Sequence, residues 1–96
     1  MSENIEDLTV EWEEGGLVTV KELDKKVLSK GAWSTIIYKY QDFNNSKQEY
    51  GPNKFTIRRY QKRNGVYSQK SKFNISSADQ AQQVIDALAG WLKEDA

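Results

Sequence analysis

The stretch FTIRRYQKRNGVYSQKSKFNI, residues 55–75, decides the fold of this chain. β-Branched and aromatic residues recur through both of its halves, which is typical of β-strands. The pair Asn64 and Gly65 between the halves is a strong signal for a tight hairpin turn, because both residues tolerate positive φ. We therefore predict two antiparallel strands, 54–62 and 66–75, joined by this turn.

Alternation along these strands sorts residue types between the two faces of a sheet. In the first strand, Arg58 and Tyr60 share one face, whereas Phe55 and Ile57 take the other. In the second strand, strict alternation places Tyr67, Phe73 and Ile75 on one face and Lys70, Lys72 and Asn74 on the other. One face of the hairpin is therefore expected to be basic.

Segments upstream of the hairpin extend the predicted sheet. Residues 33–43, WSTIIYKYQDF, are the densest in strand-forming side chains and should form a strand. Residues 17–23 and 27–29 are also expected to be extended, and alternation at 8–12 leaves room for an extra N-terminal strand or hairpin. Residues 44–53 should form a polar loop. Short connections make the sheet antiparallel.

The last segment is predicted to be a helix over residues 78–93. Its apolar residues recur at three- and four-residue spacing and form one stripe, made of Ala81, Val84, Ile85, Leu88, Trp91 and Leu92. Ser77 followed by Gln80 has the spacing of a capping box. The fold class is therefore α+β, a four-stranded antiparallel sheet followed by one C-terminal helix (β-β-β-β-α) that covers one face of the sheet.

Composition limits the chemistry available to the chain. Its 96 residues suffice for one domain, and they include no cysteine and no histidine. These absences exclude disulfides, thiol nucleophiles, and imidazole bases or metal ligands. Residues 25–72 hold only two acids, Asp42 and Glu49, and no glycine-rich loop precedes the helix. We expect no enzyme activity, no metal, no cofactor and no small-molecule substrate.

Charge is sorted along the chain although lysine plus arginine and aspartate plus glutamate both number 14. Residues 1–24 carry eight acids and one base, residues 25–72 twelve bases and two acids, and residues 73–96 four acids and one base. A basic middle between acidic ends favours a polyanionic partner. We divide the chain into an acidic, flexible N-terminal segment, 1–16, and one domain, 17–96. The acidic segment either keeps the chain soluble or lies over the basic face and competes with a polyanion.

Cations and aromatic rings interleave in the middle segment, as in surfaces that bind single-stranded nucleic acid. The cations would follow the phosphates while the rings stack on bases. The candidate nucleic-acid-binding residues are Lys39, Lys54, Arg58, Tyr60, Lys62, Arg63, Tyr67, Lys70 and Lys72. The tyrosines are equally compatible with an ordinary role in the core of a sheet.

Residues 55–80 resemble the signature of the positive cofactor 4 family, single-stranded-DNA-binding transcriptional coactivators with bacterial and phage relatives. Ile57-Arg58-Arg59-Tyr60 resembles the family's first strand motif. The run from Lys70 to Ser76 is similar to its basic strand end, and Asp79-Gln80 is similar to its helix opening. The resemblance extends over about residues 25–93. It departs from the family pattern in three places, Arg59 for an acid, Gln61 for an aromatic residue and Phe73 for a glycine.

The resemblance implies a homodimer with helices at the interface and strands lining a DNA-binding groove. It implies DNA contacts from Arg58, Lys70 and Lys72. The implied dimer interface uses the helix stripe, namely Val84, Ile85, Leu88, Trp91 and Leu92. A packed monomer core would use the same stripe.

We therefore hypothesise binding of single-stranded DNA with low sequence specificity, as in a transcriptional regulator. Two alternatives stay open: RNA binding on the same face, and a protein-interaction module without nucleic acid. No apolar run approaches the ~20 residues needed to span a bilayer, and the acidic N-terminal segment lacks signal-peptide character. The expected location is the cytoplasm, including the nucleoid, with no membrane partner.

Overall fold

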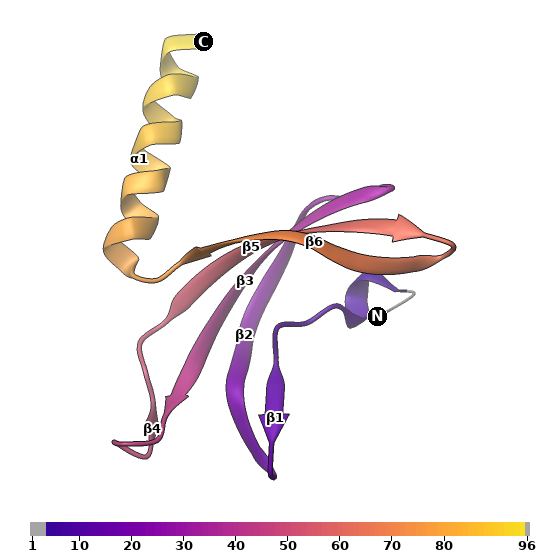
Figure 1. Cartoon of the computed structure of the whole chain (residues 1–96). Helices are drawn as coiled ribbons and strands as arrows, with labels where there is room; N and C mark the ends of the chain where they lie inside the picture. Colours follow the sequence, from indigo (N-terminus) through magenta and orange to yellow (C-terminus); the bar gives the residue numbers. More distant parts are fainter. Residues whose placement is uncertain (1–3, 96) are drawn as a thin grey trace.

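The structure, a computed structural model that describes residues 4–95, is α+β, as predicted: an antiparallel sheet is followed by one C-terminal helix (Figure 1). The elements are η1 (Ile5–Asp7), β1 (Trp12–Glu14), β2 (Leu17–Ser29), β3 (Trp33–Asn44), β4 (Glu49–Tyr50), β5 (Lys54–Arg63), β6 (Val66–Ile75) and α1 (Ala78–Asp95). The sheet order is β1-β2-β3-β5-β6, and the short β4 pairs with the end of β3.

The β5–β6 hairpin matches its prediction closely. Asn64 and Gly65 have φ values of 52° and 79°, the conformation of a type I′ turn. The optional N-terminal hairpin is also present, since β1 pairs with β2. The two predicted segments 17–23 and 27–29 form one strand, because a bulge between Glu22 and Asp24 bends β2 without ending it.

A second bulge changes which face β6 presents. Arg59 pairs with Ser71, but Tyr60 pairs with Gln69, so Lys70 is an extra residue in the ladder. Residues directly opposite each other lie on the same face. Tyr67 therefore lies on the face of Lys72, and its predicted place beside Phe73 and Ile75 is wrong.

The core forms between the sheet and the chain's own N-terminal arm, which we define as residues 4–11. Ile5, Leu8 and Val10 are only 5%, 7% and 9% exposed. They pack in one cluster with four sheet residues, Ile36, Tyr38, Tyr60 and Tyr67. We call this side of the sheet the inner face and the opposite side the outer face. For residues 4–16, η1, β1 and this packing differ from the expectation of a flexible segment over 1–16, and residues 1–3 of that segment lie outside the described residues.

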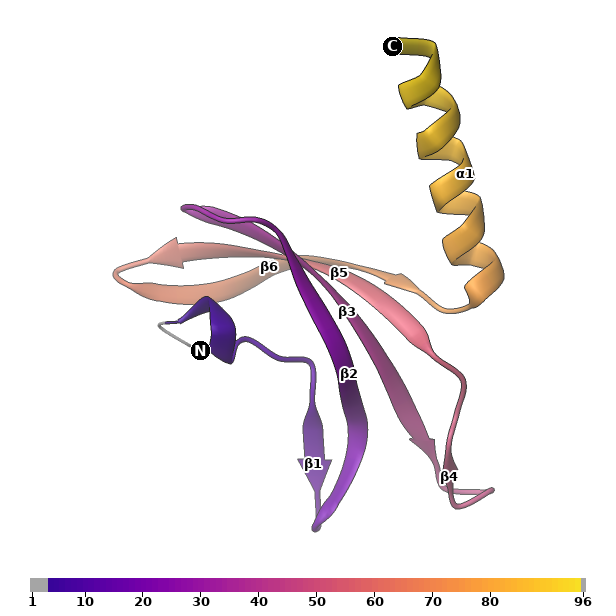
Figure 2. The ribbon, with the colours of Figure 1, turned by 180° about the vertical axis from the view of Figure 1, so that it is seen from behind.

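Helix α1 begins as its cap predicted, because Ser77 Oγ accepts a hydrogen bond of 3.1 Å from the Gln80 N–H. The helix rises from the end of β6, on the side of the sheet away from the arm (Figures 1 and 2). None of its residues, all of which the structure describes, is buried. The prediction that it covers a face of its own sheet is therefore wrong. Within residues 4–95, no helix has the length and apolar character needed to cross a membrane.

Candidate nucleic-acid interface

The register of β3, β5 and β6 brings basic and aromatic side chains onto the inner face. Tyr38 pairs with Thr56, and Ile36 pairs with Arg58. Arg58 in turn pairs with Lys72 across β5 and β6. Because paired residues share a face, Arg58 and Lys72 lie beside the buried tyrosines. This confirms the prediction that Arg58 and Tyr60, two residues apart on β5, lie on the same face.

Arg58 is held in place by neutral partners. Its Nη1 donates to Gln69 Oε1 at 2.8 Å, and its Nε donates to Thr56 Oγ1 at 3.4 Å. No carboxylate neutralises the guanidinium, since the one ion pair among the described residues joins Lys54 and Asp42. The orienting bonds leave the charge of Arg58 available to an anion.

Three further cations lie toward the hairpin turn, and all are exposed. The Lys62 ammonium lies 5.2 Å from the centroid of the Tyr67 ring, a cation–π contact. Lys70 occupies the bulge in β6, and Arg63 ends β5. With Arg58 and Lys72, these residues make the hairpin basic along its length.

Two candidate residues do not join this group. Lys54 Nζ donates to Asp42 Oδ2 at 2.8 Å, and this bond raises the pKa of Lys54. Its charge is therefore already paired. Lys39 pairs with Phe55 and Asp24 and lies on the outer face, one residue out of phase with Tyr38.

The rings of the inner face form a tyrosine cluster, defined as Tyr38, Tyr60 and Tyr67. All three are buried. The Tyr38 and Tyr60 hydroxyls are hydrogen bonded at 2.9 Å. Burial raises the pKa of Tyr38 well above its usual range, and the hydrogen bond to Tyr60 raises it further by a smaller amount, so Tyr38 stays protonated. The arm covers these rings, so base stacking on Tyr60 or Tyr67 requires the arm to move.

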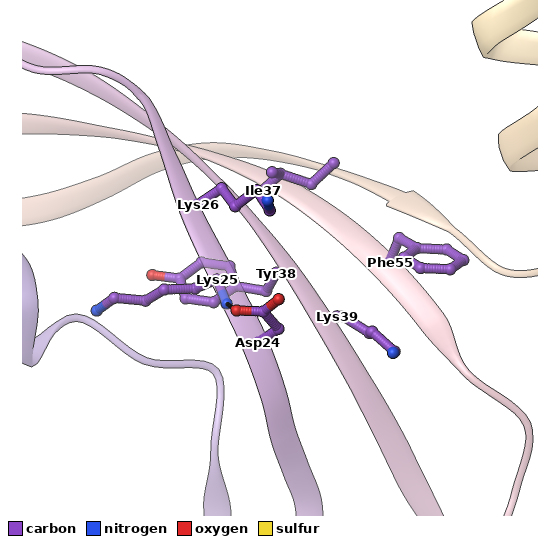
Figure 3. Close-up of a pocket in the computed structure, with 7 residues that line it drawn as sticks. All are labelled: Asp24, Lys25, Lys26, Ile37, Tyr38, Lys39 and Phe55. Atoms are coloured by element: carbon purple, nitrogen blue, oxygen red, sulfur yellow. Dashed lines mark hydrogen bonds between the residues drawn. The ribbon is translucent and has the colours of Figure 1, made fainter.

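Lys25, which the sequence analysis did not select, fastens the arm to the inner face. Its Nζ donates to the carbonyl oxygens of Ile5, Glu6 and Leu8 at 3.2, 2.7 and 2.6 Å. Figure 3 shows the Lys25 and Tyr38 side chains extending toward the arm, whereas Lys39 and Phe55 lie on the other side of the sheet. Its partners are backbone oxygens, so no side-chain pattern marks this role.

The outer face carries partly exposed apolar side chains beside the charged side chains of Lys39 and Arg59. Phe73 is exposed, and the Arg59 guanidinium lies 4.7 Å from the centroid of the exposed Trp33 ring. A shallow hollow of about 200 Å³ on this side has Ile37 and Phe55 in its lining. The predicted interface residues of α1 are also uncovered: Val84 is half-buried, and Ile85, Leu88, Trp91 and Leu92 are exposed.

Residues 4–95 hold no group of three or more acidic, histidine or cysteine side chains placed to bind a metal ion. In comparisons with known proteins, the chain matches no protein-family model, no curated protein and no solved structure.

Proposed function

We propose that this protein binds single-stranded DNA, with little sequence preference, on the inner face of the β5–β6 hairpin. The observation that carries the proposal is the pairing of Arg58 with Lys72 on the face that holds the tyrosine cluster. A single strand presents phosphates and unstacked bases together, so it needs cations and rings on one surface. The hairpin offers both.

In this proposal, phosphates follow the cations of the hairpin, and bases turn toward the tyrosine cluster. Arg58 and Lys72 hold the phosphates at the middle of the surface, and Lys62 and Lys70 extend the path toward the turn. Backbone contacts and base stacking read no base edges, which explains the expected lack of sequence preference.

We also propose that the active form is a homodimer. Most helical stability in proteins comes from packing of an amphipathic face, and α1 leaves its apolar stripe exposed, with Trp91 64% and Leu92 68% accessible. On the outer face of the sheet, Trp33 and Phe73 are exposed apolar side chains as well. A second copy supplies a partner for both surfaces, because a two-fold interface uses the same patches of both chains.

The test is a salt titration with a fluorescein-labelled oligo-dT of about 15 nucleotides, followed by fluorescence anisotropy. The logarithm of the association constant should fall linearly with the logarithm of the salt concentration, with a slope of about −0.7 per phosphate contact. Arg58→Ala with Lys72→Ala should weaken binding about a hundredfold at low salt, since a hydrogen bond to a charged group contributes about 1.5 kcal/mol or more. Circular dichroism checks that the fold persists.

The matched control is Lys30→Ala with Lys47→Ala, which removes the same number of positive charges from exposed connections outside the β5–β6 hairpin. It should leave oligo-dT affinity within about threefold. Equal losses in the two variants would show that net charge, and not the inner face, governs binding. Absence of binding at low salt would overturn the proposal, and tighter binding of oligo-rU would redirect it to RNA.

A further inference from the structure

The N-terminal arm occupies the surface proposed for the bases. Ile5, Leu8 and Val10 pack directly with the tyrosine cluster. We propose that the arm competes with DNA for the inner face. Its apolar side chains occupy the surface on which bases would stack, so the arm must leave before DNA binds. This inference rests on the proposed function and identifies how the same site is regulated.

The competition is steric before it is electrostatic. Every buried side-chain polar atom among residues 4–95 has a hydrogen-bond partner, so the arm completes the inner face as a protein core. Tyr38 is fully buried beneath it, and Tyr60 nearly so. A base cannot stack on rings that are already covered. The acids Glu6 and Asp7 are exposed, so salt screens their contribution.

In this mechanism Lys25 exchanges its hydrogen-bond partners, from carbonyl oxygens of the arm to a phosphate of the DNA. Its ammonium has three N–H donors, and the carbonyls of Ile5, Glu6 and Leu8 are its three partners. These acceptors are neutral, whereas a phosphate oxygen is charged and binds an ammonium more strongly. When the arm leaves, Lys25 becomes a phosphate contact beside the rings.

The arm makes few polar contacts with the sheet, although its three buried side chains belong to the core. Its only regular element is η1, a single turn of three residues with no side-chain cap. Besides Lys25, it is held by Thr9 Oγ1 donating to Glu22 Oε1 at 2.6 Å and by the Glu22 N–H donating to Glu11 Oε1 at 3.3 Å. Both contacts are exposed to solvent. Segments of this kind open locally at a lower free energy than global unfolding.

The experiment compares two variants of the full chain with the unchanged protein. Ile5→Asn with Leu8→Asn weakens the packing of the arm against the tyrosine cluster without changing the charge. This variant should bind oligo-dT about tenfold more tightly, because the arm has left the inner face in a larger fraction of molecules. Glu6→Gln with Asp7→Asn removes two charges but keeps the apolar packing of the arm, and should change the affinity for oligo-dT less than about threefold. Circular dichroism and gel filtration verify folding.

A locked form keeps the test decisive if the loosened variant fails to fold. The chain has no cysteine, so Thr9→Cys with Glu22→Cys gives two unique thiols where these side chains meet. Bridging them with a short bismaleimide fixes the arm and should reduce affinity at least about tenfold relative to the unbridged variant. In the unchanged protein, added oligo-dT should also speed cleavage of the arm by a glutamate-specific protease.

The outcomes separate this inference from the proposed function. Equal binding by the unchanged, loosened and locked forms would overturn the competitor role while leaving DNA binding intact. A large gain in the charge variant with none in the loosened variant would replace steric competition by electrostatic screening. No binding by any form at low salt would overturn both proposals.

Discussion

The two ends of the chain differ in what their local structure and their packing contribute. The N-terminal arm forms one uncapped turn, yet its three apolar side chains are buried. The C-terminal helix α1 has 18 residues and a formed cap at Ser77, yet none of its residues is buried. Burial therefore depends on whether a partner surface lies within reach, and not on the strength of the local conformational signal.

The difference assigns separate roles to the two ends. The arm has its partner within the chain, so its docking does not depend on protein concentration. In our proposal, α1 finds its partner in a second copy, so its contribution to stability rises with protein concentration. Four predictions break or sharpen this contrast.

Leu88→Glu should have the largest effect. In a dimer it removes two buried leucines, each contributing roughly 1.5–3 kcal/mol, so the dissociation constant should rise at least about a hundredfold. Sedimentation velocity over a range of concentrations measures this shift. Gln83→Glu adds the same charge to the opposite side of α1 and should leave the mass unchanged. A monomeric parent protein would contradict the dimer proposal.

Leu8→Ala and Leu88→Ala apply one chemical change to both ends. At Leu8, which is buried, the loss should be about 2–3 kcal/mol and independent of protein concentration. At Leu88, the loss should appear only at concentrations where the dimer forms. Denaturant unfolding at two protein concentrations distinguishes them. A concentration-dependent loss at Leu8 would place the arm in an intermolecular contact.

Ser77→Ala should destabilise α1 by about 1 kcal/mol, because the Gln80 N–H loses its acceptor. Ser76→Ala is the matched control, since the backbone N–H of Ser76 continues to donate to Gln80 Oε1. Helix content measured by circular dichroism in the Leu88→Glu background isolates the cap from dimer formation. Equal losses in the two serine variants would contradict the assigned cap.

Gly90→Ala should have the smallest effect, a gain of no more than about 1 kcal/mol from helix propensity. Among residues 4–95, nothing besides the adjoining residues and backbone of α1 itself lies within 4 Å of the added Cβ. The helical spacing places Gly90 on the side of α1 away from the stripe. Thermal unfolding should therefore show a slightly raised midpoint with the mass unchanged. A weakened dimer would mean that the partner approaches this side of α1 instead.

The parts of the fold that could be predicted are those with local signals. The turn at Asn64 and Gly65 needs positive φ, and the helix start at Ser77 needs a side-chain acceptor, so both leave a mark in the sequence. Ile5 of the arm leaves none, because it stands between Asn4 and the acids Glu6 and Asp7 and becomes a core residue only through distant strands.

The candidate site was predictable to a similar extent. Alternation placed Arg58 and Tyr60 together, and the structure confirms it. It gave no sheet register, so it could not assign Lys39 to the outer face or pair Lys54 with Asp42. The role of Lys25 could not be predicted, because its partners are backbone carbonyls that every residue possesses.

The bulge at Lys70 has a consequence for how such a sheet changes in evolution. Side chains alternate between the two faces along a strand, and a bulge accommodates one extra residue without changing the cross-strand pairs on either side of it. Because Lys70 is the extra residue, removing it would leave Ser71 opposite Arg59 and Tyr67 opposite Lys62, with Tyr67 still on the inner face. A single inserted codon can thus enter a strand as a bulge and leave the side chains on both sides of it on their original faces, whereas the same insertion without a bulge would reverse one end of the strand.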